Sequence, residues 1–269
     1  MPVDNGIVLD ATNVTKIYRD FWLRPKTLAV NDITFNVARG DVFGLLGPNG
    51  SGKSTTLKMM LGLLYPTTGN IRILDCSPKD EHVKAAIGYM PEETYLYKHL
   101  TARETLDFYG RIFDLQHAER RERVNQLLEM AGLQHTDHMR IGEYSKGMAR
   151  KVALAQALIN DPALLILDEP TSGLDPVACR QVKDLLHTLA RRGKTIIMAS
   201  HVLADVQDVC GRVAILCNGR IQIQGRVPEL LNGQSTLEEL FLAVVTQAQT
   251  KGGVLARTGG SIPAYLSGR

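Results

Sequence analysis

The chain has 269 residues, of which 44% are hydrophobic and 22% are charged. These values fit one large α/β domain, or two small ones, with a sizeable core. The formal net charge of +3 is too small an excess to indicate nucleic acid or anionic lipid as a partner. No apolar run reaches the roughly 18 residues of a membrane-spanning helix, so a membrane role would have to come through another protein.

The cysteines show neither a C-x-x-C pair nor a metal-binding spacing, and we expect reduced thiols in a cytosolic protein at Cys76, Cys179, Cys210 and Cys217. His135 and His138 could share one helical face, but the loop around them offers no evident third ligand, so no metal is predicted there. The first residues lack the apolar core of a signal peptide, which also favours a cytosolic location.

Residues 7–46 alternate apolar and polar side chains and carry many β-branched residues, which predicts strands. The last of them, DVFGLLG, is a short apolar run that enters a glycine-rich loop, as a buried parallel strand does. A helix is expected after that loop over LKMMLGLL, and further strands are expected over NIRILD and IGYMP.

Residues 93–160 change character and predict a helical subdomain inserted into the chain. Thr101 and Glu104 form the Thr-x-x-Glu capping box that starts one helix. The next helix is expected to stop at Gly132. A third helix is expected to begin at Ser145, whose hydroxyl can cap it.

This third helix start, EYSKGMARK, has the features of an anion site. Gly147 lets backbone approach closely, and Lys146, Arg150 and Lys151 make the start basic. The first N–H groups of a helix lack partners and the helix dipole is positive there, so anions are favoured. The question is which anion it serves, because a stronger phosphate site lies earlier in the chain.

Residues 163–224 return to alternating strands and helices, which implies right-handed βαβ units and a largely parallel sheet. We predict one α/β domain over residues 1–233, with the helical subdomain at about 93–160 inserted within it. Residues 234–269 are expected to add a short helix and, after about residue 247, a glycine-rich disordered tail.

The phosphate site is GPNGSGKS, a full match to the phosphate-binding loop between a strand and a helix. Its glycines let main-chain N–H groups wrap around phosphates, Lys53 supplies a point charge, and the Ser54 hydroxyl can ligate Mg²⁺. The residues expected to hold the nucleotide here are Gly47, Pro48, Asn49, Gly50, Ser51, Gly52, Lys53, Ser54 and Thr55.

The stretch ALLILDEP supplies a buried strand that ends in Asp168 and Glu169. Ligands in open α/β sheets bind at the carboxyl ends of strands, so both carboxylates are expected beside the phosphate loop. We expect Asp168 to hold Mg²⁺ and Glu169 to face the γ-phosphate and polarise the attacking water.

In the order of its motifs, the chain resembles the ATP-binding subunits of ABC transporters over roughly residues 7–233. GPNGSGKST is similar to Walker A, LLILDEP to Walker B, YSKGM to the signature Leu-Ser-Gly-Gly-Gln, and SGLD to the D-loop. The resemblance implies an α/β P-loop NTPase core with a mainly parallel sheet, an N-terminal antiparallel β portion and an inserted helical subdomain. It also implies hydrolysis of ATP with Mg²⁺.

The resemblance assigns roles to further residues. Tyr18 matches the aromatic that stacks on adenine, although it could instead be a strand aromatic in the core. His201 matches the switch histidine that contacts the γ-phosphate. The expected catalytic residues are Lys53, Glu169 and His201. The remaining expected nucleotide contacts, toward the ATP of a second subunit stacked head to tail, are Asp175, Ser145, Lys146 and Gly147.

Two motifs depart from the family pattern. Lys146 replaces the first signature glycine and Met148 the usual glutamine, but the added positive charge lies near an anion, so binding should persist. Glu92 stands where the family usually has the Q-loop glutamine. Its carboxylate can ligate Mg²⁺ together with Ser54 and Asp168, yet it adds negative charge beside the phosphates, which leaves its catalytic role open. Both departures resemble the branch that pairs with a separately encoded membrane subunit, often for export.

The implied function is ATP-driven transport through a membrane permease, with the chain peripheral on the inner face of the membrane and paired with a second ATPase subunit, most simply a copy of itself. Residues 94–100 would meet the permease, or would pack within the helical subdomain. The alternatives are a soluble ABC ATPase that remodels protein or nucleic acid, and a nucleotide-binding module with little turnover. Soluble remodelling ATPases usually carry two ATPase domains or long coiled-coil insertions, and this sequence shows neither. Glu169 and His201 argue against a module with little turnover.

Overall fold

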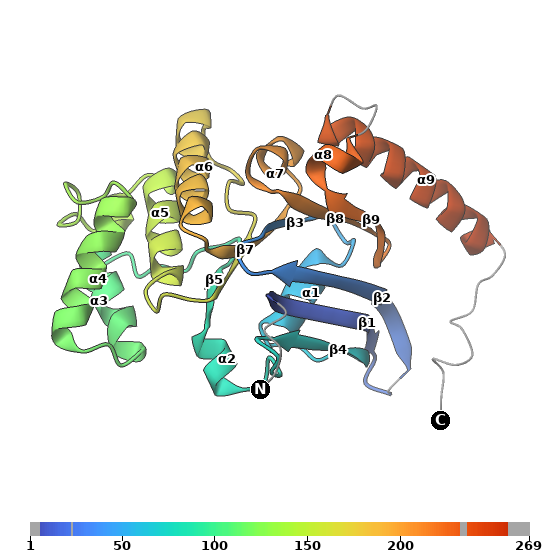
Figure 1. The fold of residues 1–269 in the computed structure, drawn as a ribbon, viewed down its shortest axis with the longest axis horizontal. Helices are drawn as coiled ribbons and strands as arrows, with labels where there is room; N and C mark the ends of the chain where they lie inside the picture. Colours follow the sequence, from blue (N-terminus) through green and yellow to red (C-terminus); the bar gives the residue numbers. More distant parts are fainter. Residues whose placement is uncertain (1–5, 23, 232–235, 258–269) are drawn as a thin grey trace.

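Two β-sheets and the helices around them make up the fold (Figure 1). The computed structural model describes residues 6–22, 24–231 and 236–257. The first sheet is antiparallel, in the order β2-β1-β4, with β1 (Ile7–Arg19), β2 (Pro25–Ala38) and β4 (Thr68–Ile73). The second has the order β5-β6-β7-β3-β8-β9, with β3 (Val42–Leu46), β5 (Ile87–Met90), β6 (Leu164–Asp168), β7 (Thr195–Ser200), β8 (Arg212–Cys217) and β9 (Arg220–Arg226).

The second sheet is parallel except for the pairing of β8 with β9. Its helices are α1 (Lys53–Met60), α2 (Glu81–Ala85), α5 (Lys146–Ala157), α6 (Pro176–Arg191), α7 (Leu203–Val209) and α8 (Val227–Leu230). The remaining helices are α3 (Ala102–Ile112), α4 (His117–Met130), the 3₁₀ turn η1 (Ile141–Glu143) and α9 (Leu237–Arg257). The predicted fold class, a mainly parallel α/β sheet with an antiparallel N-terminal portion and inserted helices, is confirmed.

Two hydrophobic cores cover the two faces of the six-stranded sheet. On one face α1 lies between the two sheets, where Leu57 and Met60 pack with Ile33 of β2 and Ile166 of β6. On the other face α5, α6 and α7 pack through apolar side chains such as Leu154, Leu186 and Val206. Packing on both faces fixes the edge of the sheet, at the carboxyl ends of its strands, from which the phosphate loop emerges.

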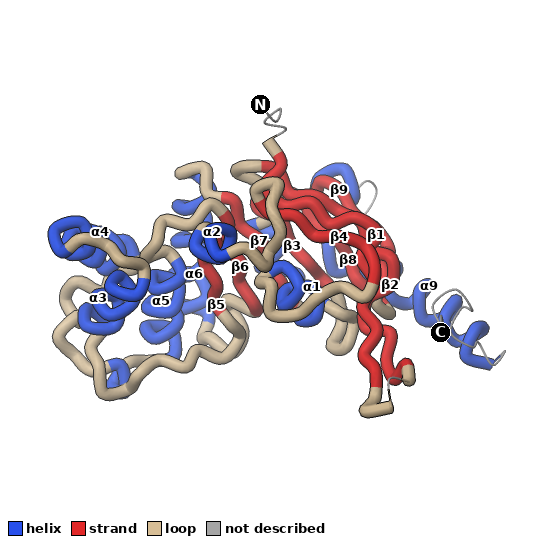
Figure 2. The backbone as a smooth tube through the Cα atoms, turned by 90° about the horizontal axis from the view of Figure 1, so that it is seen from below, coloured by secondary structure: helices blue, strands red, loops and turns tan. Residues whose placement is uncertain are grey.

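Residues 93–160, called the helical block below, lie at one end of the molecule, away from the antiparallel sheet, in both views (Figure 2). Its first helix has the predicted capping box: the Glu104 N–H donates to Thr101 Oγ1 over 3.1 Å, and the Thr101 N–H donates to Glu104 Oε2 over 2.8 Å. Gly132, expected to end the second helix, follows α4 with a φ of 62°. Ser145 caps α5 by accepting from the Met148 N–H.

The C-terminal helix α9 is longer than expected, because it continues through the glycine pair to Arg257 instead of ending near Gln247. The rest of the expected tail, residues 258–269, lies outside the described residues. In α9, Leu237 and Leu240 pack into the core beside α7, and Ala248 is also buried. Within the described ranges, no helix combines the length and hydropathy needed to cross a membrane.

Candidate nucleotide-binding site

The register of the parallel sheet places three strand ends side by side. Leu46, the last residue of β3, pairs with Ser200 at the end of β7, and Asp168 at the end of β6 pairs with Ala199. The phosphate loop, the two carboxylates and His201 follow these ends directly, so they meet at one edge of the sheet, where α/β proteins bind ligands. The pocket there is lined by residues 27–29 and 49–55 with Glu92, Asp168, Glu169 and His201.

The loop glycines are required by close packing. A Cβ on Gly47 would lie 2.3 Å from the carbonyl oxygen of Leu216, and one on Gly52 would lie 2.6 Å from that of Ala29. Gly50, with a φ of 77°, faces open space instead. The loop is therefore pressed against β2 and β8 on one side while its other side opens into the pocket.

Lys53 is buried at the base of this loop, with 7% of its surface exposed. Its ammonium donates to the carbonyl oxygens of Gly47 at 2.6 Å and Pro48 at 3.3 Å. Burial lowers the pKa of Lys53, and the carboxylates of Glu169 and Asp168 oppose that shift. The result is a cation held in a poorly solvated site, where its attraction to an anion is strengthened.

The side chains of Glu169 and His201 are in contact at the pocket. His201 Nδ1 lies 2.8 Å from Glu169 Oε1, and Ser200 Oγ donates to Glu169 Oε2 at 3.1 Å. The Glu169 backbone has a φ of 49°, a conformation that costs a non-glycine residue about 1–3 kcal/mol. Its N–H donates to the Ala199 carbonyl, which locks the backbone so that the carboxylate points toward His201.

Asp168 lies in a negative environment. Burial raises its pKa to about 6, and the charges of Glu169 and Glu92 add to the effect, while Lys53 and Arg150 oppose it. Carboxylate and hydroxyl oxygens are the hard ligands that Mg²⁺ prefers. A buried carboxyl with a raised pKa in a pocket is a sign of a functional site, and a bound cation would offset the negative charge there.

Arg150 is the functional residue that the sequence analysis misplaced. We expected it to add charge at the α5 surface, but only 6% of it is exposed, because it lies on the same face of α5 as the buried Gly147 and Leu154. Its guanidinium donates to the carbonyl oxygens of Glu169, Pro170 at 3.0 Å, Pro91 at 3.2 Å and Glu92 at 2.5 Å. Only the apolar spacing of the helix could have indicated that position 150 faces inward.

Tyr18 is not a core aromatic, since 38% of it is exposed. Its hydroxyl lies 3.4 Å from Thr55 Oγ1 in the phosphate loop. The ring is thus beside the pocket mouth, where the assigned contact with a base remains a prediction.

The signature residues do not line this pocket. Ser145 and Lys146 are exposed on the same chain, and Asp175 uses its carboxylate to cap α6 by accepting from Val177 and Ala178 N–H groups. Gly147 is buried against α6, because a Cβ there would lie 2.6 Å from that of Ala178. The close approach that we expected for this glycine thus occurs within the chain.

Four features of this site together define a P-loop nucleotide-binding protein. They are its place at the edge of a parallel sheet, the glycine loop that enters a helix, the buried lysine and the carboxylates at the strand ends. Comparison of the sequence and the fold with known proteins identifies the family within this class. Residues 30–172 match the ABC transporter family. The chain belongs to this family, as an ATP-binding subunit.

Two relatives and one solved structure illustrate the similarity. The chain is 40% identical over 232 residues to an uncharacterized ABC transporter ATP-binding protein, all4389, of Nostoc sp. (strain PCC 7120), covering 85% of this chain and 69% of that protein. It is 40% identical over 221 residues to the Nod factor export ATP-binding protein I of Rhizobium sp. (strain N33), and the match covers 81% of this chain and 71% of that protein. It shares 27% identity and a TM-score of 0.72 with the ATP-binding cassette MJ0796 in a dimeric post-hydrolysis state bound to ADP and Pi, covering 81% and 98%.

Proposed function

We propose that this chain hydrolyses ATP with Mg²⁺ and thereby drives export through a separate membrane permease. The observation that carries the proposal is the convergence of Lys53, Asp168, Glu169 and His201 at one sheet edge. A related cassette holds ADP and Pi, which supports hydrolysis, and a relative named as an export ATP-binding protein supports the direction.

The phosphate loop and α1 would bind the triphosphate. The first N–H groups of α1 have no acceptor within the helix, and no side chain caps its start at Gly52. The Ser51 hydroxyl is buried without a hydrogen-bond partner in the described part of the chain, which fits a polar ligand in the loop. Lys53 would exchange its carbonyl contacts for phosphate oxygens.

Mg²⁺, when bound, would neutralise charge on the phosphate oxygens. The residues that would hold it are Ser54, Asp168 and Glu92, all of which line the pocket. Asp168, whose pKa is raised in the metal-free chain, would be deprotonated in that complex, because a cation favours the charged carboxylate.

Glu169 would orient the attacking water and accept its proton. Its carboxylate is already aligned by His201 Nδ1 and Ser200 Oγ, so little reorganisation is needed. His201 remains half exposed beside it and would contact the γ-phosphate through its other ring nitrogen. Positioning and charge stabilisation, not covalent chemistry, would supply the acceleration.

The permease would dock on the exposed aromatic residues of the helical block. Tyr95, Tyr97 and Phe108 are 82%, 50% and 42% exposed, and the rings of Tyr97 and Phe108 touch edge to face. Exposed aromatic side chains of this kind are enriched at protein interfaces. A permease bound there would place the chain on the inner face of the membrane.

The test is Glu169→Gln in the purified chain. We expect phosphate release to fall by roughly 10²–10⁴-fold, because the amide cannot accept the proton, while ATP binding is retained. Phosphate release and binding of a fluorescent ATP analogue measure the two effects separately.

The matched control is Glu93→Gln, since Glu93 is an exposed neighbour of Glu92 that does not line the pocket. It should hydrolyse ATP at the wild-type rate. Normal turnover of Glu169→Gln would refute the assigned role, and a wild-type chain that binds ATP but never releases phosphate, even with its permease, would refute the activity.

A further inference from the structure

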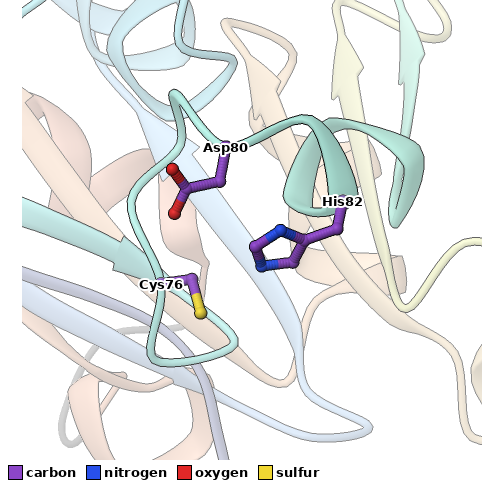
Figure 3. Close-up of side chains that lie close together, drawn as sticks. All are labelled: Cys76, Asp80 and His82. Carbon is purple, nitrogen blue, oxygen red and sulfur yellow. The ribbon is translucent and has the colours of Figure 1, made fainter.

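A mixed cluster of metal-ligating side chains lies between β4 and α2, outside the nucleotide pocket. Its members are Cys76, Asp80 and His82, which the structure turns toward one common space (Figure 3). One ligand atom from each residue lies within 4.8 Å of the other two. We propose that these three residues form a site for a zinc-type divalent cation.

Cys76 is held by a tight turn. Leu74 and Asp75 both have positive φ, 53° and 62°, and Cys76 exchanges two backbone hydrogen bonds with Ile73. These are the features of a type I′ turn, whose backbone is strongly restricted. The Leu74 N–H also donates to Val8 of β1, so the turn is tied to the antiparallel sheet.

The other two ligands are held by the start of α2. Asp80 precedes the helix and His82 lies in its first turn, and the helix is fixed by the fully buried Val83. The Ser77 N–H donates to Asp80 Oδ2 at 3.2 Å, which orients the carboxylate and leaves Oδ1 free. Orientation of a ligand by an outer hydrogen bond is typical of metal sites.

The donor set selects the metal. A thiolate, an imidazole and a carboxylate are the ligands that zinc uses, whereas Mg²⁺ and Ca²⁺ prefer oxygen alone. With bonds of about 2.0–2.3 Å, tetrahedral ligands lie about 3.5 Å apart, so the side chains must close by at most about 1.3 Å. His82 is exposed and can rotate toward the other two ligands without losing packing. Water would complete the fourth position.

The lysine next to Asp80 in the sequence is directed elsewhere. The Lys79 ammonium lies over the ring of Tyr65, 4.2 Å from its centroid. The cluster lacks the paired cysteines that indicate a metal site in a sequence; a single cysteine combines with Asp and His in the spacing C-x₃-D-x-H.

The experiment titrates the nucleotide-free chain with Zn²⁺ in buffer that contains excess Mg²⁺. We expect the wild type to bind Zn²⁺. Because the ion binds the folded state, it should also raise the melting temperature of the chain. Cys76→Ser and His82→Gln should each weaken that binding by at least the roughly 10–100-fold that loss of an outer-shell partner costs. The matched control is Cys179→Ser, because Cys179 also contacts a carboxylate, Asp205, at 3.5 Å, and it should bind Zn²⁺ as the wild type does.

A second measurement detects the bond between the metal and the thiolate directly. Wild-type chain loaded with Co²⁺ should show the near-ultraviolet absorption of a thiolate–metal bond, and the Cys179→Ser chain should retain it. Equal Zn²⁺ affinity in wild type, Cys76→Ser and His82→Gln would overturn the proposal. So would the lack of a thiolate band in the Co²⁺-loaded wild type.

Discussion

At the Asp168 carboxyl, function and stability are opposed. The folded protein raises the pKa of this group from 3.8 to about 6, first through burial and then through the charges of Glu169 and Glu92. Between these two pH values the folded state therefore binds more protons at Asp168 than the unfolded state does. The contribution of this group to the free energy of unfolding is thus greatest below pH 4, falls as the pH rises, and is fully lost above about pH 6.

We expect Asp168→Asn to stabilise the nucleotide-free, metal-free chain near pH 7.5 by about 1–2 kcal/mol, after allowance for solvent screening at this half-buried group. The amide does not ionise, so it avoids the penalty. Urea unfolding in the presence of chelator, at pH 4.5 and pH 7.5, measures it. A stability difference between variant and wild type that is the same at both pH values would contradict the assignment. Mg²⁺-dependent ATP binding should be weakened in the same variant.

At the scale of elements, one helix holds two loops. Arg150, on α5, donates to Pro91 and Glu92 after β5 and to Glu169 and Pro170 after β6. Burial lowers the pKa of Arg150, while the nearby carboxylates oppose that shift. The guanidinium can serve both loops at once because its donors form a planar fork.

Replacing Arg150 with Met should lower the free energy of unfolding by about 2–4 kcal/mol, because buried carbonyl groups lose their donor. Turnover at saturating ATP should fall further than ATP affinity, since the loops that carry Glu92 and Glu169 lose their common support. Arg150→Lys should recover only part of both, because an ammonium lacks the fork.

Lys151→Met is the matched control, since among the described residues the Lys151 ammonium makes one hydrogen bond, a long one of 3.3 Å to Gln181, and holds no loop of the pocket. Urea unfolding and steady-state ATPase kinetics compare the two positions. If Arg150→Met unfolds and turns over as Lys151→Met does, α5 does not support these loops.

The features predictable from the sequence were local ones. The capping box at Thr101 and the phosphate loop depend on residues a few positions apart, so their spacing determines their geometry. The position of Glu169 beside the phosphate loop was also predictable, because parallel strands end at a common edge. Arg150 and Cys76 were not, since their partners are defined by packing and by turn conformation.

At the scale of the whole molecule, one chain carries a nucleotide pocket and, apart from it, an exposed helix start. Ser145 and Lys146 are exposed, and neither lines the pocket. A related cassette is dimeric with ADP and Pi. We propose that two copies stack head to tail, each covering the other's ATP with the start of α5.

The test mixes two inactive chains, Lys53→Ala and Lys146→Glu. Lys146 is preferred to Gly147, because a side chain at Gly147 would collide with Ala178 in the same chain. In the mixed dimer both lesions fall on one site and the other is intact, so an equal mixture with two-fold symmetric pairing should recover up to about a quarter of wild-type activity. A rate no greater than the average of the two parent chains would argue against shared sites that fire singly.

Dimerisation provides the independent measurement. Sedimentation of Glu169→Gln with ATP should show a dimer, and adding Lys146→Glu to that chain should weaken it, because a carboxylate would face the γ-phosphate. A Glu169→Gln chain that stays monomeric with ATP, even in the presence of its permease, would refute the head-to-tail arrangement.

The close packing of Gly147 on Ala178 would couple the two sites of such a dimer. With no room for a Cβ between them, α5 and the start of α6 must shift together. The same α5 holds the Glu169 loop through Arg150. A chain that relaxes its own catalytic loop after phosphate release would therefore withdraw the surface that it lends to its neighbour. Loss of phosphate at one site would then also loosen the other site, so we expect the two sites of such a dimer to influence each other's opening.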